Sequence, residues 1–157
     1  MKVIFLDIDG VLNSHRSAKA LGGMPFPGRS KDRDWHLFDP VAVGLLRKVC
    51  EETGAVCVLS SSWRMGMGGR EMKDLSECLG VAIIGATKDT SYNEPRGEQI
   101  AEWLERHPEV TRYAIIDDDS DMLDEQKEFF AQTSFQEGMM FHHYMRLTHI
   151  LGIKDEA

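Results

Sequence analysis

The sequence predicts an α/β fold, a Rossmann-like three-layer sandwich with a central parallel sheet, as a single domain over residues 1–157. Short apolar runs of branched residues, typical of strands buried on both faces, alternate with segments of helical period. Strands that are separated by helices favour right-handed crossovers and therefore a parallel sheet. No apolar run approaches the roughly 20 residues that span a bilayer, so no membrane partner is expected.

The first half of the chain holds three expected strands and two expected helices. Residues 2–7 form a short run of branched and aromatic residues without alternation, which predicts a buried strand. Asp39 and Pro40 are residue types typical of an N-cap and a first helical position, so a helix is expected from there to Gly54. The other elements expected here are a strand over 55–60, a helix over 70–79 that Gly80 ends, and a strand over 81–85.

The second half continues the alternation. A helix is expected over 96–107, with Ile100 and Trp103 facing inward and Pro108 closing it. A fourth strand is expected over 112–116, just before a run of aspartates. The remaining elements are a candidate fifth strand over 129–132 and a final helix over 141–151.

Residues 14–34 depart from this pattern, since they are rich in glycine, proline and basic residues and show little periodicity. We expect this insertion to form a short basic cap or flap, over about 14–38, that overhangs the carboxyl end of the sheet. A solvated loop that balances local acidic charge is the alternative. The basic residues that could contact a polyanionic substrate are Arg16, Arg29, Lys31 and Arg33.

Charge and cysteine content limit the classes of protein. A formal net charge of −8 argues against a protein that coats nucleic acid or anionic membrane by charge alone. The three cysteines are odd in number and lack CxxC spacing, which favours a reduced, cytoplasmic compartment. No constitutive protein partner can be inferred from these features.

The strongest chemical signal lies where the first strand ends, in Asp7-Ile8-Asp9-Gly10. If strand geometry persists, Asp7 and Asp9 point the same way, because side chains alternate with period two. Two converging carboxylates repel each other, and a cation relieves the repulsion. Gly10 allows close backbone approach at this point. A plain Asx-Gly turn is the alternative.

A second acidic group, Asp117, Asp118, Asp119 and Asp121, follows the fourth strand. Oxygen ligands with few fixed side chains suit Mg²⁺, and Asp118 is the favoured ligand. The alternative is an N-cap cluster for a helix that begins near Ser120.

Phosphate-binding groups are expected after the second strand and at the start of the helix over 96–107. The hydroxyl and backbone N–H groups of Ser60 and Ser61 can hold phosphate oxygens, and Arg64 can add a bidentate contact. Arg96 begins a helix, where the dipole favours anions, and this placement indicates a cation that reaches a negatively charged pocket. An ordinary loop and an exposed arginine are the alternatives.

Together these motifs resemble the haloacid dehalogenase-like phosphohydrolase superfamily. Asp7 to Val11 matches its first motif, Ser60 its second, Arg96 its third, and Asp117-Asp118 its acidic fourth, in the right order. The resemblance implies that Asp7 forms an aspartyl-phosphate and that Asp9 acts as general acid and then general base. It also implies Mg²⁺ bound by Asp7, Asp9, Asp118 and Asp117, and phosphate held by Ser60, Ser61, Arg64, Arg96 and Gly10.

Within the superfamily, the sequence is most similar to polynucleotide 3′-phosphatase and RNA-repair domains with a minimal cap (C0/C1-like). The resemblance implies an Mg²⁺-dependent phosphomonoesterase, with an open pocket that suits the 3′-phosphate end of a polynucleotide. A small-molecule phosphatase such as a 5′(3′)-nucleotidase is the alternative, and a receiver-like phospho-acceptor or an inactive binding domain is a remote one. Two departures from the group are the later position of Arg64 after Ser60 and an arginine, not a lysine, at position 96.

Overall fold

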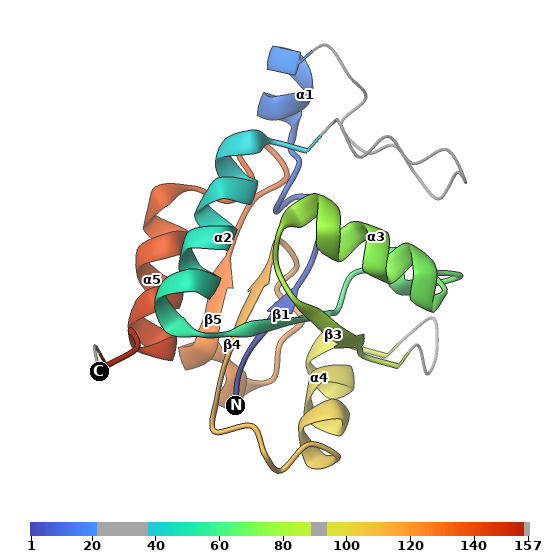
Figure 1. Cartoon of the computed structure of the whole chain (residues 1–157), viewed down its shortest axis with the longest axis vertical. Helices are drawn as coiled ribbons and strands as arrows, with labels where there is room; N and C mark the ends of the chain where they lie inside the picture. The colour runs from blue at the N-terminus through green and yellow to red at the C-terminus, as the bar shows by residue number, and fades with distance from the viewer. Residues whose placement is uncertain (22–37, 89–93, 156–157) are drawn as a thin grey trace.

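The structure is a computed structural model and describes residues 1–21, 38–88 and 94–155. It holds a parallel sheet of five strands in the order β3-β2-β1-β4-β5, with helices on both faces (Figure 1). The predicted α/β fold with a Rossmann-like parallel sheet is therefore confirmed. The strands are β1 (Lys2–Leu6), β2 (Val56–Leu59), β3 (Ile83–Ala86), β4 (Arg112–Asp117) and β5 (Phe130–Gln132).

The helix α2 (Pro40–Thr53) begins and ends at the capping residues that the sequence indicates. The Asp39 carboxylate accepts the backbone N–H of Val41 at 2.9 Å, and Gly54 ends the same helix with a left-handed φ of 75°. Within the described ranges, no helix has the length and apolar character that crossing a membrane requires. The helices are α1 (His15–Leu21), α2 (Pro40–Thr53), α3 (Gly69–Leu79), α4 (Arg96–Glu105) and α5 (Phe141–Leu151), with short 3₁₀ segments η2 (Ser62–Arg64) and η3 (Asp124–Phe129).

The central strand β1 is buried on both faces of the sheet. On one face, Ile4 and Leu6 pack in a cluster with residues of α2, α3 and α5. On the other face, Val3 and Phe5 pack with residues of α4, including Trp103. This double burial explains the unbroken apolar run of β1. It also fixes the carboxyl end of β1 in the middle of the sheet, where the acidic motif begins.

The segment expected as an irregular cap begins with α1, a helix that the sequence did not predict. Ser14 and Ser17 start this helix, because the backbone N–H of each donates to the hydroxyl of the other, at 2.9 and 3.1 Å. The spacing of these serines is the signal that could have indicated it. The rest of the expected cap, including Arg29, Lys31 and Arg33, lies outside the described residues.

The alternative prediction of a helix that begins near Ser120 is wrong. Residues 118–123 have no helical structure, and η3 begins only at Asp124. Contacts with α4 hold this segment in place. Asp121 accepts the backbone N–H of Arg96 on its carboxylate at 2.9 Å and that of Gly97 on its carbonyl at 3.1 Å. Asp121 therefore satisfies N–H groups at the start of α4 instead of starting a helix of its own.

Candidate active site

The acidic residues meet where two neighbouring strands end. Asp7 directly follows β1, Asp117 ends β4, and these strands pair in parallel with Leu6 opposite Ile116. The Asp7 backbone N–H donates to the Ile116 carbonyl at 3.1 Å, which continues the ladder to the site. From β1 the sheet runs through β2 to β3 on one side and through β4 to β5 on the other. Ligands of open α/β sheets bind at such a switch point.

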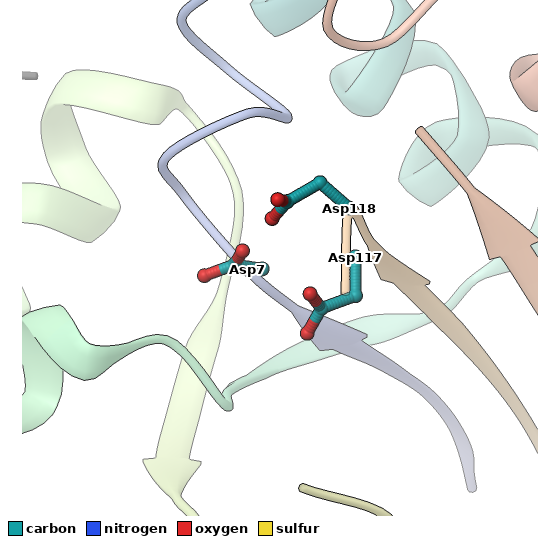
Figure 2. A group of neighbouring side chains, drawn as sticks. All are labelled: Asp7, Asp117 and Asp118. Carbon is teal, nitrogen blue, oxygen red and sulfur yellow. The ribbon is translucent and has the colours of Figure 1, made fainter. Parts of the chain in front are cut away.

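Asp7, Asp117 and Asp118 form a compact carboxylate cluster (Figure 2), with one oxygen of each within 4.8 Å of the others. Burial and the Asp7 charge raise the pKa of Asp117 to about 8, although Arg96 opposes the shift. Burial, a hydrogen bond with Asp7 and the Asp7 charge raise the pKa of Asp118 to about 7. Asp117 and Asp118 therefore do not both ionise readily at neutral pH without additional positive charge.

Arg96 supplies a positive charge to this cluster from the first turn of α4. Its Nη1 lies 2.7 Å from Asp117 Oδ2 and 3.2 Å from Asp7 Oδ1, and its side chain is 17% exposed. Burial alone would lower the pKa of Arg96, but the charges of Asp117 and Asp7 outweigh it and raise the pKa. The prediction that Arg96 reaches a negatively charged pocket agrees with this geometry. Its contact with phosphate stays a prediction.

The turn after Asp7 packs directly against the cluster. Gly10 has a φ of 79°, and a Cβ atom there would lie 2.9 Å from Asp118 Cγ. Glycine is therefore required both by the backbone conformation and by the close approach of Asp118. The Thr133 hydroxyl donates to the Gly10 carbonyl at 2.6 Å, so the residue that follows β5 also fixes this turn. No feature of the sequence indicated this contact of Thr133.

The Asp9 carboxylate accepts hydrogen bonds from two other parts of the chain. Its Oδ1 accepts the Asn13 amide at 3.0 Å, and its Oδ2 accepts the Trp63 indole N–H at 2.9 Å. Asn13 also accepts the Gly10 backbone N–H at 3.0 Å. Neither partner of Asp9 follows from the sequence motifs. The only signals were their positions, within the Asp7 motif for Asn13 and within the serine-rich segment after β2 for Trp63.

The loop after β2 lies next to Asp7 because β2 also pairs with β1. The Ser60 backbone N–H donates to the Leu6 carbonyl at 3.0 Å, and its fully buried hydroxyl has no hydrogen-bond partner among the described residues. A buried hydroxyl without a hydrogen-bond partner costs free energy, and the contact of Ser60 with phosphate stays a prediction. The Ser61 hydroxyl instead accepts the Trp63 backbone N–H at 3.2 Å.

Arg64 holds the same loop in place. Its Nη1 donates to the Ser60 and Ser61 carbonyls at 2.9 and 2.7 Å, and its Nη2 donates to Gln99 Oε1 at 2.6 Å. These contacts tie the loop to α4, and the expected contact of Arg64 with phosphate stays a prediction. Arg16, the described residue among the expected cap contacts, lies 3.8 Å from Glu137 at the surface.

A Rossmann-like sheet with acidic side chains at the ends of two central strands is the arrangement of haloacid dehalogenase (HAD)-type hydrolases, the class that the sequence motifs resemble. A family model described as "HAD domain in Swiss Army Knife RNA repair proteins" matches residues 3–143, so the chain belongs to this HAD family. Among solved structures, a haloacid dehalogenase-like family hydrolase from Streptococcus pneumoniae is similar, with a TM-score of 0.49 and 13% sequence identity over 95% of this chain and 90% of that chain. Comparison with curated proteins gave no match.

Proposed function

We propose that this HAD-family hydrolase is a Mg²⁺-dependent phosphomonoesterase that works through a phosphorylated Asp7. One observation carries the proposal. The buried Asp7 carboxylate shares a cluster with Asp117 and Asp118, whose oxygens lie within 4.8 Å, and meets Arg96 at 3.2 Å. A carboxylate nucleophile and an anionic phosphate repel each other, so the reaction needs positive charge beside both groups. The carboxylate cluster could bind a cation, and Arg96 already lies next to it.

The described residues fit a magnesium ion. The cluster offers only oxygen donors, few in number, as suits an ion that keeps several waters. Gly10 leaves room beside Asp118 that any Cβ atom would fill. Asp7 and Asp118 would hold the ion, with the Asp9 carbonyl as the third protein ligand that the family resemblance implies and with Asp117 beside them. When bound, Mg²⁺ would offset the charge between the carboxylates and the phosphate oxygens.

In the proposed mechanism, the Asp7 carboxylate attacks phosphorus in line, and the bond from phosphorus to the leaving oxygen breaks with its electron pair on that oxygen. Asp9 gives its proton to this oxygen and becomes a carboxylate. Asp9 then takes a proton from a water molecule, whose oxygen attacks phosphorus and releases Asp7 and inorganic phosphate. The Ser60 hydroxyl and the Arg96 guanidinium would hold the phosphoryl oxygens throughout.

The proposed substrate is the 3′-phosphate end of a polynucleotide. Membership of a family of HAD domains that occurs in RNA repair proteins supports this choice. The excess of basic residues over residues 14–34, in an acidic chain, supports it independently, because that segment joins the end of the Asp7 motif to α2. A small-molecule phosphatase is the second candidate.

A comparison of substrates tests this choice. We expect kcat/KM to be higher for a 3′-phosphorylated oligonucleotide than for 3′- and 5′-mononucleotides, because a polymer presents many more phosphates to basic residues. The preference should fall as salt concentration rises, since screening weakens contacts between charges. Release of inorganic phosphate measures both. Charge reversal at Arg29, Lys31 and Arg33 should reduce the oligonucleotide rate while sparing 4-nitrophenyl phosphate. Higher kcat/KM for mononucleotides would contradict the polynucleotide assignment and favour the second candidate.

Metal binding should depend on pH in a defined direction. Since Asp117 and Asp118 have pKa values raised to about 8 and 7, protons compete with the metal at both groups. We expect Mg²⁺ to raise the Tm more at pH 8.5 than at pH 6, measured by thermal unfolding. Asp118→Asn should lose most of this shift. Asp119→Asn, an exposed neighbour outside the cluster, should retain it. An equal shift in wild type and Asp118→Asn would place the metal elsewhere.

A further inference from the structure

We propose that Trp63 is the positioning residue of the general acid, and that its indole N–H holds the Asp9 carboxylate in the orientation needed for proton transfer. This inference rests on the proposed phosphatase function. The two oxygens of Asp9 receive N–H donors from two separate parts of the chain. Asn13 Nδ2 lies 3.0 Å from Oδ1, and Trp63 Nε1 lies 2.9 Å from Oδ2. One donor would leave the carboxyl group free to turn about its Cβ–Cγ bond, whereas two donors fix that torsion.

The indole is itself held rigidly. Trp63 is only 4% exposed, and its ring packs against that of Phe38, with centroids 5.6 Å apart. Its backbone lies in η2, where its N–H donates to the Ser61 hydroxyl. Arg64 fastens this turn to the Ser60 and Ser61 carbonyls. A donor mounted on a buried ring can hold its acceptor with little loss of conformational freedom on binding.

The same loop therefore performs two tasks. It carries the buried Ser60 hydroxyl, which has no partner in the described part of the chain and is proposed to hold a phosphoryl oxygen. Three residues later it carries the indole that holds the acid. The leaving oxygen is bonded to the phosphorus that this loop would help to bind. Trp63 thus sets the position of Asp9 relative to the phosphate rather than relative to the sheet alone. A small displacement of the acid matters because proton transfer needs hydrogen-bond reach.

The proposed effect is specific to the first step of the reaction. As the bond from phosphorus to the leaving oxygen breaks, the Asp9 O–H bond breaks and a new O–H bond forms on the leaving alcohol. An alkoxide such as a ribose oxygen leaves poorly without that proton. A 4-nitrophenolate leaves readily without it. Loss of the Trp63 donor should therefore slow the hydrolysis of alkyl phosphates far more than that of 4-nitrophenyl phosphate.

Trp63→Phe tests this, because it removes the N–H and keeps most of the buried ring. We expect kcat/KM for a 3′-phosphorylated oligonucleotide to fall by about 10–10²-fold, a part of the 10²–10⁴-fold that general acid catalysis typically contributes. The value for 4-nitrophenyl phosphate should change by less than about threefold. The ratio kcat/KM is the proper readout, since it covers the steps through leaving-group departure and excludes the later use of Asp9 as a base.

Trp103→Phe is the matched control. Trp103 is similarly buried, at 5% exposed, but packs on the opposite face of the sheet and stacks on His107. It should leave the ratio of the two kcat/KM values unchanged. Asp9→Asn should also reduce kcat/KM selectively for the oligonucleotide, and by more than Trp63→Phe does.

A spectroscopic measurement keeps the test independent of how Trp63→Phe folds. Both the wild type and Asp9→Ala keep Trp63, so its indole N–H proton resonance can be compared between them. This resonance should lie further upfield in Asp9→Ala, while that of Trp103 stays in place. An equal decrease of kcat/KM for both substrates, or an indole resonance that does not change in Asp9→Ala, would overturn the positioning role. Neither result would contradict the phosphatase proposal. A wild-type protein that hydrolyses neither substrate would overturn the phosphatase proposal itself, and this inference with it.

Discussion

Asp7→Asn is expected to abolish turnover while leaving the protein folded. The amide cannot act as the nucleophile that becomes phosphorylated, so kcat should fall by about 10⁴-fold or more, as expected when a covalent nucleophile is lost. We expect the variant to fold because the negative charge of Asp7 repels the neighbouring carboxylates. That charge contributes to the raised pKa values of Asp117 and Asp118, so its removal should lower both.

The covalent step can be measured directly. Wild-type protein given substrate labelled in the phosphate and quenched in acid should carry the label on Asp7, and Asp7→Asn should carry none. Circular dichroism and thermal unfolding would show that the variant is folded. Asp119→Asn removes an exposed carboxylate two residues beyond Asp117 and should label normally. Label on another side chain, or near-normal turnover by Asp7→Asn, would contradict the mechanism.

The sequence predicted the position of this site well because the fold fixes it. In a parallel sheet, the carboxyl ends of neighbouring strands lie together, so acids that follow two buried strands can meet without any further information. The clustering of Asp7 with Asp117 and Asp118 needed only that β1 and β4 pair. A glycine after the acids also signalled close packing, and Gly10 does lie against Asp118.

Features that depend on side-chain direction across distant segments could not be predicted. The hydrogen bond from Trp63 to Asp9 joins residues that are 54 positions apart. Neither the sequence around Asp9 nor the sequence around Trp63 specifies it. Residues 118–123 have the residue types of a helix start, but contacts of Asp121 with the start of α4 outweigh that local preference. The hydrogen bonds from Arg64 to carbonyls of its own loop also had no signal in the sequence, and its contact with phosphate stays a prediction.

Arg96→Ala is expected to have the largest effect on stability. The substitution removes a mostly buried guanidinium that meets Asp117 at 2.7 Å and Asp7 at 3.2 Å. Loss of one partner of a buried ion pair leaves uncompensated charge and typically costs about 3–5 kcal/mol. We expect a decrease of this size in the unfolding free energy of the metal-free protein, measured by denaturant titration above pH 8, where Asp117 is ionised in the wild type.

This loss should grow with pH, in a direction that the pKa values define. In the wild type, Asp117 keeps its proton up to about pH 8, because burial and the Asp7 charge raise its pKa while Arg96 opposes them. Without Arg96 the folded-state pKa rises further, so the folded variant still binds a proton above pH 8 that the unfolded chain has released. Stability then continues to fall with rising pH in the variant after it has levelled in the wild type.

Added Mg²⁺ should reverse part of the loss, because the ion would bring positive charge to the same carboxylates. Arg47→Ala is the matched control. Arg47 donates to the Leu79 and Cys78 carbonyls at the end of α3, so its removal should cost stability that neither Mg²⁺ nor pH 9 alters. If Arg96→Ala behaved in the same way, Arg96 would be a structural cap like Arg47. It would not then be the counter-charge of Asp7 and Asp117, and the proposed nucleophile would lose its support.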